Sequence, residues 1–137
     1  MVLVDTSVWV DFFNGVDTPE VNGLDELLGS ARLVIGDLIL AEILQGFTRD
    51  ADYRKARNLL ASIPHTDLVG HDVALAAADN YRTLRRRGIT VRKTIDVIIG
   101  TFCIVNNHEL LHSDRDFDAM EQALGLRVFR RPESSQS

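Results

Sequence analysis

The sequence is poor in cysteine and has no apolar run long enough to span a membrane. Cys103 is the only cysteine among 137 residues, which excludes an internal disulfide, and the apolar residues around it form no metal-ligand pattern. The longest stretches without a charged residue, such as 97–107, fall well short of the roughly 20 residues that a membrane-spanning helix needs. No basic segment of the kind found in signal peptides follows Met1. These absences predict a soluble, cytoplasmic protein.

Internal repeats, low-complexity runs and linkers rich in proline or glycine are also missing. A chain of 137 residues, 45% of them hydrophobic, is long enough for one domain with a real core and too short for two. We therefore predict a single domain over residues 1–129. Residues 130–137 are expected to form a polar, disordered tail.

A surplus of basic residues is missing too, since the net charge is −5. This balance speaks against a protein that coats nucleic acid, because phosphate binding normally draws on an excess of lysine and arginine. Basic side chains nevertheless gather in one short stretch, which contains Arg82, Arg85, Arg86, Arg87, Arg92 and Lys93. Such a run most often forms a solvated face, but it could also form a local basic surface beside an acidic pocket.

Short, apolar and β-branched runs alternate with segments of helical spacing along the chain. Strands are expected at 2–4, 32–35, 65–69, 109–112 and 126–129. Helices are expected at 8–14, around 24–28, and at 37–47, 53–62, 73–87, 94–107 and 116–124, with Thr6 or Ser7 capping the first. This alternation predicts an α/β protein, a three-layer α/β/α sandwich around a mainly parallel central sheet.

Acidic residues occupy four notable positions in this pattern. Asp5 follows the first strand, and Asp114 with Asp116 follows the strand near 109–112. Ligands of parallel sheets gather at these carboxyl ends. Glu42 and Asp96 lie inside otherwise apolar helical segments, where an unpaired carboxylate is costly.

Each acid, taken alone, has a structural explanation. Asp5, Asp96 and Asp114 could cap helices, and Glu42 could pair with an arginine. Together they require four separate explanations, whereas one hard divalent cation such as Mg²⁺ or Mn²⁺ would relieve the repulsion among all of them. No set of histidines and cysteines at zinc spacing competes, since the nearest pair, His108 and His112, spans a predicted turn and strand.

Four short motifs contain these acids: VDTSVWVDF at 4–12, AEILQG at 41–46, DVII at 96–99 and LLHSDRDFD at 110–118. Together they resemble the PIN-domain ribonucleases, specifically the VapC toxins of bacterial toxin–antitoxin modules. The resemblance covers nearly the whole chain. It implies a compact PIN-like fold and a Mg²⁺- or Mn²⁺-dependent endoribonuclease, a hydrolase with one or two ions per site. It further implies a homodimer, inhibited by a VapB-type antitoxin, that cleaves a structured RNA such as tRNA or rRNA.

The resemblance also assigns roles to residues. Asp5, Glu42, Asp96 and Asp114 match the acidic quartet of the family, Asp116 matches an additional acid, and Thr6 matches a supporting hydroxyl. His112 departs from the pattern, since many relatives have a small hydroxyl residue there. On this basis the acids are predicted to bind metal, with Glu42 completing the site or orienting the attacking water. RNA backbone binding is predicted for Arg85, Arg86, Arg87, Arg92 and Lys93.

Two alternatives come from other classes of protein. A receiver-type signalling module shares the length and the α/β alternation, but it needs an acidic pair after the first strand, where this chain has Asp5-Thr6-Ser7. A non-catalytic PIN-like interaction module would keep the fold without the activity. The complete acid set argues against it.

Overall fold

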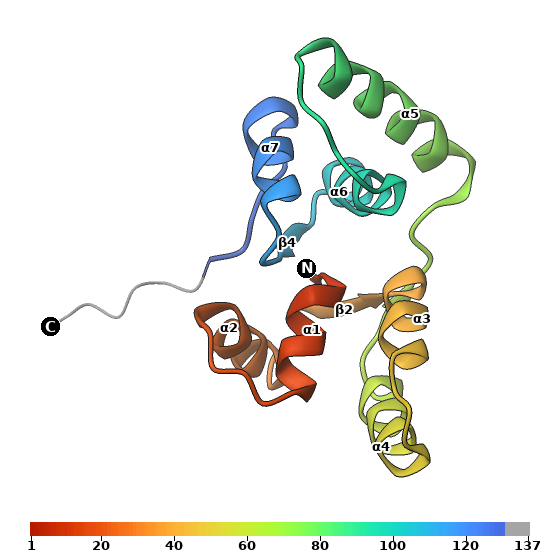
Figure 1. Ribbon diagram of the computed structural model, residues 1–137, viewed down its shortest axis with the longest axis vertical. Coiled ribbons are helices and arrows are strands. Elements are labelled where there is room, and N and C mark those ends of the chain that lie inside the picture. The colour runs from red at the N-terminus through yellow and green to blue at the C-terminus, as the bar shows by residue number, and fades with distance from the viewer. Residues whose placement is uncertain (131–137) are drawn as a thin grey trace, which may run out of the picture.

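A computed structural model describes residues 1–130. Its sheet has four parallel strands in the order β3-β2-β1-β4. The strands are β1 (Val2–Val4), β2 (Leu33–Gly36), β3 (His65–Thr66) and β4 (Glu109–Leu111). In Figure 1 the N-terminus lies at the centre of the molecule, because β1 runs between β2 and β4. The carboxyl end of β1 is therefore flanked by strands on both sides.

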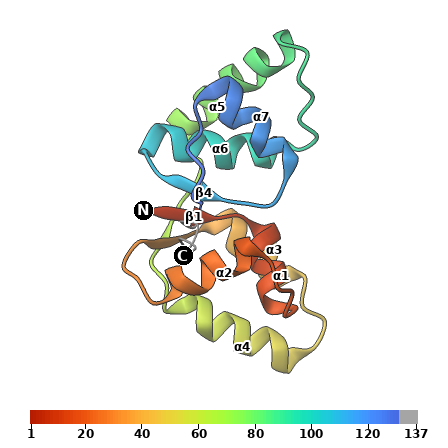
Figure 2. The ribbon, with the colours of Figure 1, turned by 90° about the vertical axis from the view of Figure 1, so that its left-hand side faces the viewer.

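Helices cover both faces of the sheet, as Figure 2 shows, with α1 to α4 in one layer and α5 to α7 in the other. Their bounds are α1 Thr6–Phe13, α2 Pro19–Leu28, α3 Asp37–Gln45, α4 Asp50–Ala61, α5 Gly70–Arg86, α6 Thr94–Asn106 and α7 Arg115–Leu124. Burial from both sides explains why every residue of β1 and β2 is apolar or glycine and buried. None of the described helices is long and apolar enough to cross a membrane.

The predicted α/β/α sandwich is confirmed, and its sheet is parallel throughout the described residues. Two details were wrong. The segment 126–129 is not a strand but pairs only through an isolated bridge between Leu110 and Val128. Asp5, rather than Thr6 or Ser7, caps α1. The predicted tail lies outside the described residues except for Arg130, whose guanidinium pairs with Glu121 at 2.9 Å. The domain boundary therefore stays a prediction.

Helix α6 is the most buried of the described helices, and its first turn lies at the edge of the sheet where the acids gather. Its apolar residues pack against α5, α7 and β4. The Asn80 amide of α5 donates a hydrogen bond of 3.0 Å to the buried Thr101 hydroxyl. Asn107 ends the helix in a left-handed conformation with φ 61°. These contacts fix the first turn of α6, where Asp96 lies.

Gly36 joins β2 to α3 at a point of close packing. A Cβ built there would lie 2.5 Å from Cδ1 and 2.6 Å from Cγ of Leu68, whose side chain is fully buried. Only a residue without a side chain permits this approach, which sets the start of α3 relative to the sheet.

We predict that Gly36→Ala lowers the free energy of unfolding by about 1–3 kcal/mol, because the added methyl group overpacks a filled core. Gly29→Ala is the matched control, since a Cβ at Gly29 meets nothing closer than a carbonyl oxygen at 3.9 Å. Urea unfolding of both variants measures the difference. Equal stability of Gly36→Ala and the wild type would contradict the close packing.

Candidate active site

Asp5 holds the first position of the site, at the carboxyl end of the central strand. Its backbone N–H donates to the Leu111 carbonyl at 2.9 Å, which continues the β1–β4 pairing up to this residue. Its carboxylate caps α1 and accepts hydrogen bonds from the Ser7 hydroxyl at 2.7 Å and the Ser7 N–H at 3.3 Å. Only 5% of Asp5 is exposed. Strand pairing and capping together hold this carboxylate in one place.

Glu42 reaches the same edge from α3. The Thr6 hydroxyl donates a hydrogen bond of 2.6 Å to Oε1 of Glu42, so the residue after Asp5 orients the glutamate. Asp37 anchors the start of α3 because its Oδ1 accepts hydrogen bonds from the N–H groups of Leu38 and Leu68. The predicted supporting contact of Thr6 is thus present, and it is made to Glu42.

Asp96, Asp114 and Asp116 form the densest part of the site. One carboxylate oxygen from each lies within 4.8 Å of the others. Asp114 caps α7 by accepting the Asp116 N–H at 3.0 Å. The capping explanation of Asp5 and Asp114 is therefore correct, yet it does not compete with a role in the site. Capping fixes two carboxylates where they face the others.

The protein's own groups leave part of the charge in this cluster without a partner. Burial, opposed by the hydrogen bonds from Ser7, raises the pKa of Asp5. Burial, followed by the nearby charge of Asp5, raises the pKa of Asp96 to about 6. The buried Oδ2 of Asp96 has no hydrogen-bond partner among the described residues. A buried carboxylate oxygen without a donor, beside other carboxylates, fits a divalent cation that prefers oxygen ligands.

Arg92 lies beside two acids of the site, a contact that the sequence did not predict. Its guanidinium lies 3.4 Å from Oδ2 of Asp116 and 3.8 Å from Oδ1 of Asp114, although 69% of its side chain is exposed. The binding of RNA backbone by Arg92 stays a prediction. The run of basic residues gave no signal for the acid contact, because only the fold brings the loop before α6 next to α7.

The other predicted basic residues lie at the end of α5 and directly before α6. Arg85 and Arg86 end α5 and Arg87 caps it, and all three are exposed. The guanidinium carbon of Arg85 lies 5.7 Å from the centroid of the Tyr81 ring. Lys93 precedes Asp96, and its charge opposes the rise in the pKa of that acid.

Comparison with known proteins identifies the family. The PIN domain family model matches residues 2–122. The chain is 31% identical over 130 residues to VapC ribonuclease Mb1587 of Mycobacterium bovis and to ribonuclease VapC11 of Mycobacterium tuberculosis, covering 93% of this chain and 97% of each relative. The chain belongs to the PIN-domain family, and within it to the VapC ribonucleases.

Solved PIN-domain structures share the fold. VapBC2 from Rickettsia felis, bound to a DNA fragment from its promoter, has a TM-score of 0.75 at 16% identity and covers 94% of this chain and 98% of that one. Mycobacterium tuberculosis VapC20, a toxin that cleaves the sarcin–ricin loop, has a TM-score of 0.67 at 18% identity, with 96% and 100% coverage. These likenesses confirm the PIN-like fold.

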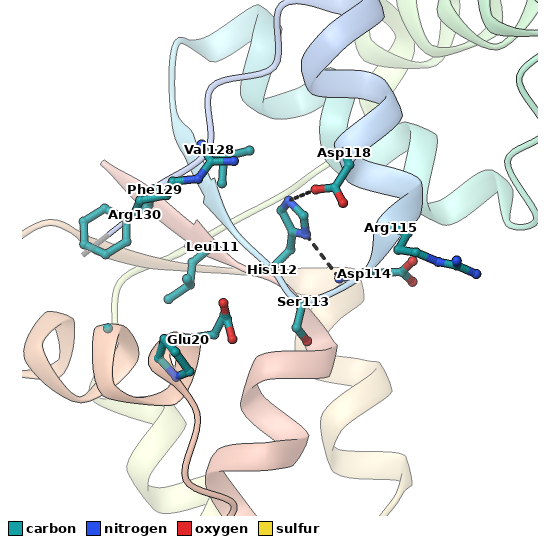
Figure 3. Close-up of a pocket in the computed structure, with 12 residues that line it drawn as sticks. Glu20, Leu111, His112, Ser113, Asp114, Arg115, Asp118, Val128, Phe129 and Arg130 are labelled. Atoms are coloured by element: carbon teal, nitrogen blue, oxygen red, sulfur yellow. Dashed lines mark hydrogen bonds and ion pairs between the residues drawn. The ribbon is translucent and has the colours of Figure 1, made fainter. Parts of the chain in front are cut away.

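His112 is the feature of this PIN domain that the acid set does not explain. Burial lowers the pKa of His112, and the nearby Asp118 opposes that shift. Nδ1 of the ring accepts the Asp114 N–H at 3.2 Å, so His112 helps to hold the turn that carries Asp114. Figure 3 shows the ring between this turn and Asp118, at the wall of a cavity of about 350 Å³.

The raised pKa of Asp96 predicts how stability depends on pH in protein stripped of divalent cations. The folded state holds this proton more tightly than the unfolded state, so the free energy of unfolding falls as the pH rises from about 4 to about 6. Above pH 6 Asp96→Asn should therefore be more stable than the wild type by about 1–3 kcal/mol, and the difference should vanish near pH 4.

Thermal or urea unfolding in EDTA at pH 4, 5, 6 and 7.5 measures this difference. Asp25→Asn, at an exposed position of α2, controls for the change in net charge. A less stable Asp96→Asn at pH 7.5 would show that the Asp96 carboxylate is favourably paired.

Proposed function

We propose that this protein is the toxin of a toxin–antitoxin module, an endoribonuclease that hydrolyses phosphodiester bonds in RNA with Mg²⁺ or Mn²⁺. Two observations on one carboxylate carry the proposal: Oδ2 of Asp96 is buried without a hydrogen-bond partner among the described residues, and one oxygen each of Asp96, Asp114 and Asp116 lie within 4.8 Å of one another. Such a site is costly in a protein that has no cation to place there. The family membership and the relatives named as ribonucleases support the same activity.

The residues present fit one or two divalent cations. Asp5, Asp96 and Asp114 would hold the first, directly or through water, and Asp116 would serve a second, weaker position. A bound divalent cation would supply positive charge, which would stabilise the negative charge that builds up on the phosphate oxygens and make a water more nucleophilic. Glu42 would complete the shell or orient that water.

Contacts within the chain hold the side chains that would position the attacking water. Thr6 holds Glu42 through a 2.6 Å hydrogen bond, which limits the rotation of the carboxylate. The Ser113 hydroxyl lies 3.2 Å from the Ser7 hydroxyl, which in turn donates to Asp5, so the ends of β1 and β4 are tied together. Hydrolysis adds the water oxygen to phosphorus and breaks the bond to the leaving oxygen. Fixed carboxylates lower the reorganisation needed in that step.

Basic residues would offset the repulsion between the acids and RNA. We assign backbone binding to Arg85, Arg86, Arg87, Arg92 and Lys93, all of which are exposed. Arg92 differs from the other four because it already contacts the acids. It would turn from Asp114 and Asp116 toward the substrate when a cation takes its place.

The partners follow from the same family. The structural neighbours include toxin–antitoxin complexes, such as VapBC from Salmonella typhimurium bound to DNA, with a TM-score of 0.74. This supports a VapB-type antitoxin as inhibitor. A structured RNA target such as tRNA or rRNA, a homodimer and a cytoplasmic location are further parts of the proposal. A non-catalytic or receiver-like module explains neither the acid cluster nor the ribonuclease relatives.

Asp5→Asn and Asp96→Asn should each lower RNA cleavage by at least about 100-fold, because each removes charge where the cation must bind. The test incubates total cellular RNA with protein, with and without Mg²⁺ or Mn²⁺, and maps the fragment ends. Asp25→Asn should cleave like the wild type, and circular dichroism should show that all three variants fold. Cleavage in EDTA, or full activity of Asp96→Asn, would defeat the assignment.

Arg92→Ala should bind Mn²⁺ about two- to fivefold more tightly than the wild type. Removing the guanidinium frees Asp114 and Asp116 and takes a positive charge away from the site, although its exposure keeps the effect small. Isothermal titration without RNA measures the affinity. Arg87→Ala is the control, since Arg87 ends α5 and makes no described contact with these acids. Weaker Mn²⁺ binding by Arg92→Ala would contradict competition between the arginine and the cation.

A further inference from the structure

The cavity beside the acid cluster has features that metal binding does not use. It holds about 350 Å³ and lies between the first turns of α2 and α7, against the end of β4. Asp114 and Ser113 line its rim, so it opens directly next to the proposed cut site. Leu111, Val128 and Phe129 form an apolar wall. Its size is at the lower end of the range for small-molecule pockets, which suits one planar group.

His112 lines this cavity, and one of its ring nitrogens is buried without a hydrogen-bond partner. Only 5% of its side chain is exposed, and Nε2 has no hydrogen-bond partner among the described residues. Because Nδ1 accepts the Asp114 N–H, the proton of the neutral ring is on Nε2. Oδ1 of Asp118 lies 3.8 Å from Nε2, beyond hydrogen-bond distance. A buried donor left without a partner favours a ligand that brings an acceptor.

Two carboxylates supply acceptors at the same cavity. Glu20 comes from α2 and Asp118 from α7, on opposite sides of His112 (Figure 3). Neither accepts a hydrogen bond from another residue in the part of the chain that the structure describes. The two arginines that line the cavity form no hydrogen bond with either carboxylate among the described residues, although the charge of Asp118 acts on Arg130. Arg130 forms two hydrogen bonds of 2.9 Å with Glu121, and Arg115 points away from the cavity in Figure 3.

The polar groups of the cavity indicate which part of an RNA chain it could bind. Two carboxylates would repel a phosphate, so the occupant is uncharged and carries N–H donors. A flat, unpaired base meets both requirements, and Phe129 offers an aromatic surface at the wall. Among the four bases only guanine has two adjacent N–H donors, N1–H and the N2 amino group, which match the two oxygens of one carboxylate. Its O6 is an acceptor for Nε2 of His112.

We propose that this cavity binds a guanine base of the RNA next to the cut site, with Asp118 or Glu20 accepting from N1–H and N2–H and His112 donating to O6. The inference rests on the proposed ribonuclease function and deepens it. It makes His112 and Asp118 specificity-determining residues, separate from the acids that hold the cation. Cleavage would then favour positions with guanine at one fixed place relative to the broken bond.

Nucleotide binding tests the cavity without any cleavage. Wild-type protein in EDTA is titrated with 5′-GMP, 5′-IMP and 5′-AMP, which share the phosphate and differ at the base edge. GMP should bind roughly tenfold more tightly than IMP, which lacks the N2 amino group, and than AMP. The NMR signals of the His112 ring should shift with GMP. Equal affinities for the three nucleotides, or an unmoved His112 signal, would overturn the proposal.

Variants locate the contacts. Asp118→Asn should lower GMP affinity roughly tenfold, because its amide places a donor against the base donors, and Asp79→Asn, at an exposed position of α5, should not. His112→Asn keeps a short acceptor for the Asp114 N–H but removes the Nε2 donor, so it should also weaken the binding of GMP. Unchanged GMP binding by a folded Asp118→Asn together with a folded Glu20→Gln would overturn the carboxylate contact.

Mapping of RNA fragment ends separates this proposal from the nuclease function. The wild type should show guanine enriched at one position, and Asp118→Asn should keep cleaving while losing that enrichment. An enrichment that both Asp118→Asn and Glu20→Gln retain would overturn the proposed role of the cavity. If neither the wild type nor Asp118→Asn cleaves RNA, the proposed nuclease function is wrong. The nucleotide titration alone then decides whether the cavity binds guanine.

Discussion

Repulsion among carboxylates held at one edge of a parallel sheet is the constraint on which the rest of the site depends. Asp5 and Asp96 are buried, and the pKa of each is raised above its ordinary value, chiefly by burial. A fold tolerates such a cluster only where strand pairing, helix caps and close packing hold every member in place. The β1–β4 pairing, the caps of α1 and α7 and the tight join at Gly36 all meet at this edge.

The same local devices therefore serve stability and function together. Asp5 and Asp114 are helix caps, which satisfy N–H groups that would otherwise lack partners, and capping also sets the direction of their carboxylates. Thr6 lies in the first turn of α1, and its hydroxyl orients Glu42. A capping residue with one oxygen toward the helix keeps the other available to a ligand. The capping and site explanations are two uses of one geometry.

Neighbouring parts of this edge are suited to different parts of an RNA chain. The cluster of Asp96, Asp114 and Asp116 fits a cation and, through it, a phosphate. The adjoining cavity, lined by Glu20, Asp118 and the ring of His112, is proposed to bind an uncharged base. His112 links the two, because Nδ1 of its ring holds the turn that carries Asp114. Chemistry and base selection would thus be adjacent but carried by different side chains.

The sequence by itself determined the fold class, the alternation of strands and helices and the set of acids, because apolar periodicity and isolated charges are local signals. It did not determine the short bridge at Val128, since strand pairing depends on a neighbour far along the chain. Only the tertiary structure placed Arg92 against Asp114 and Asp116, and His112 at a cavity between α2 and α7. Arg92 and Asp116 are 24 positions apart, and α2 is farther still from His112 along the chain, so these placements follow from the packing of whole helices on the sheet.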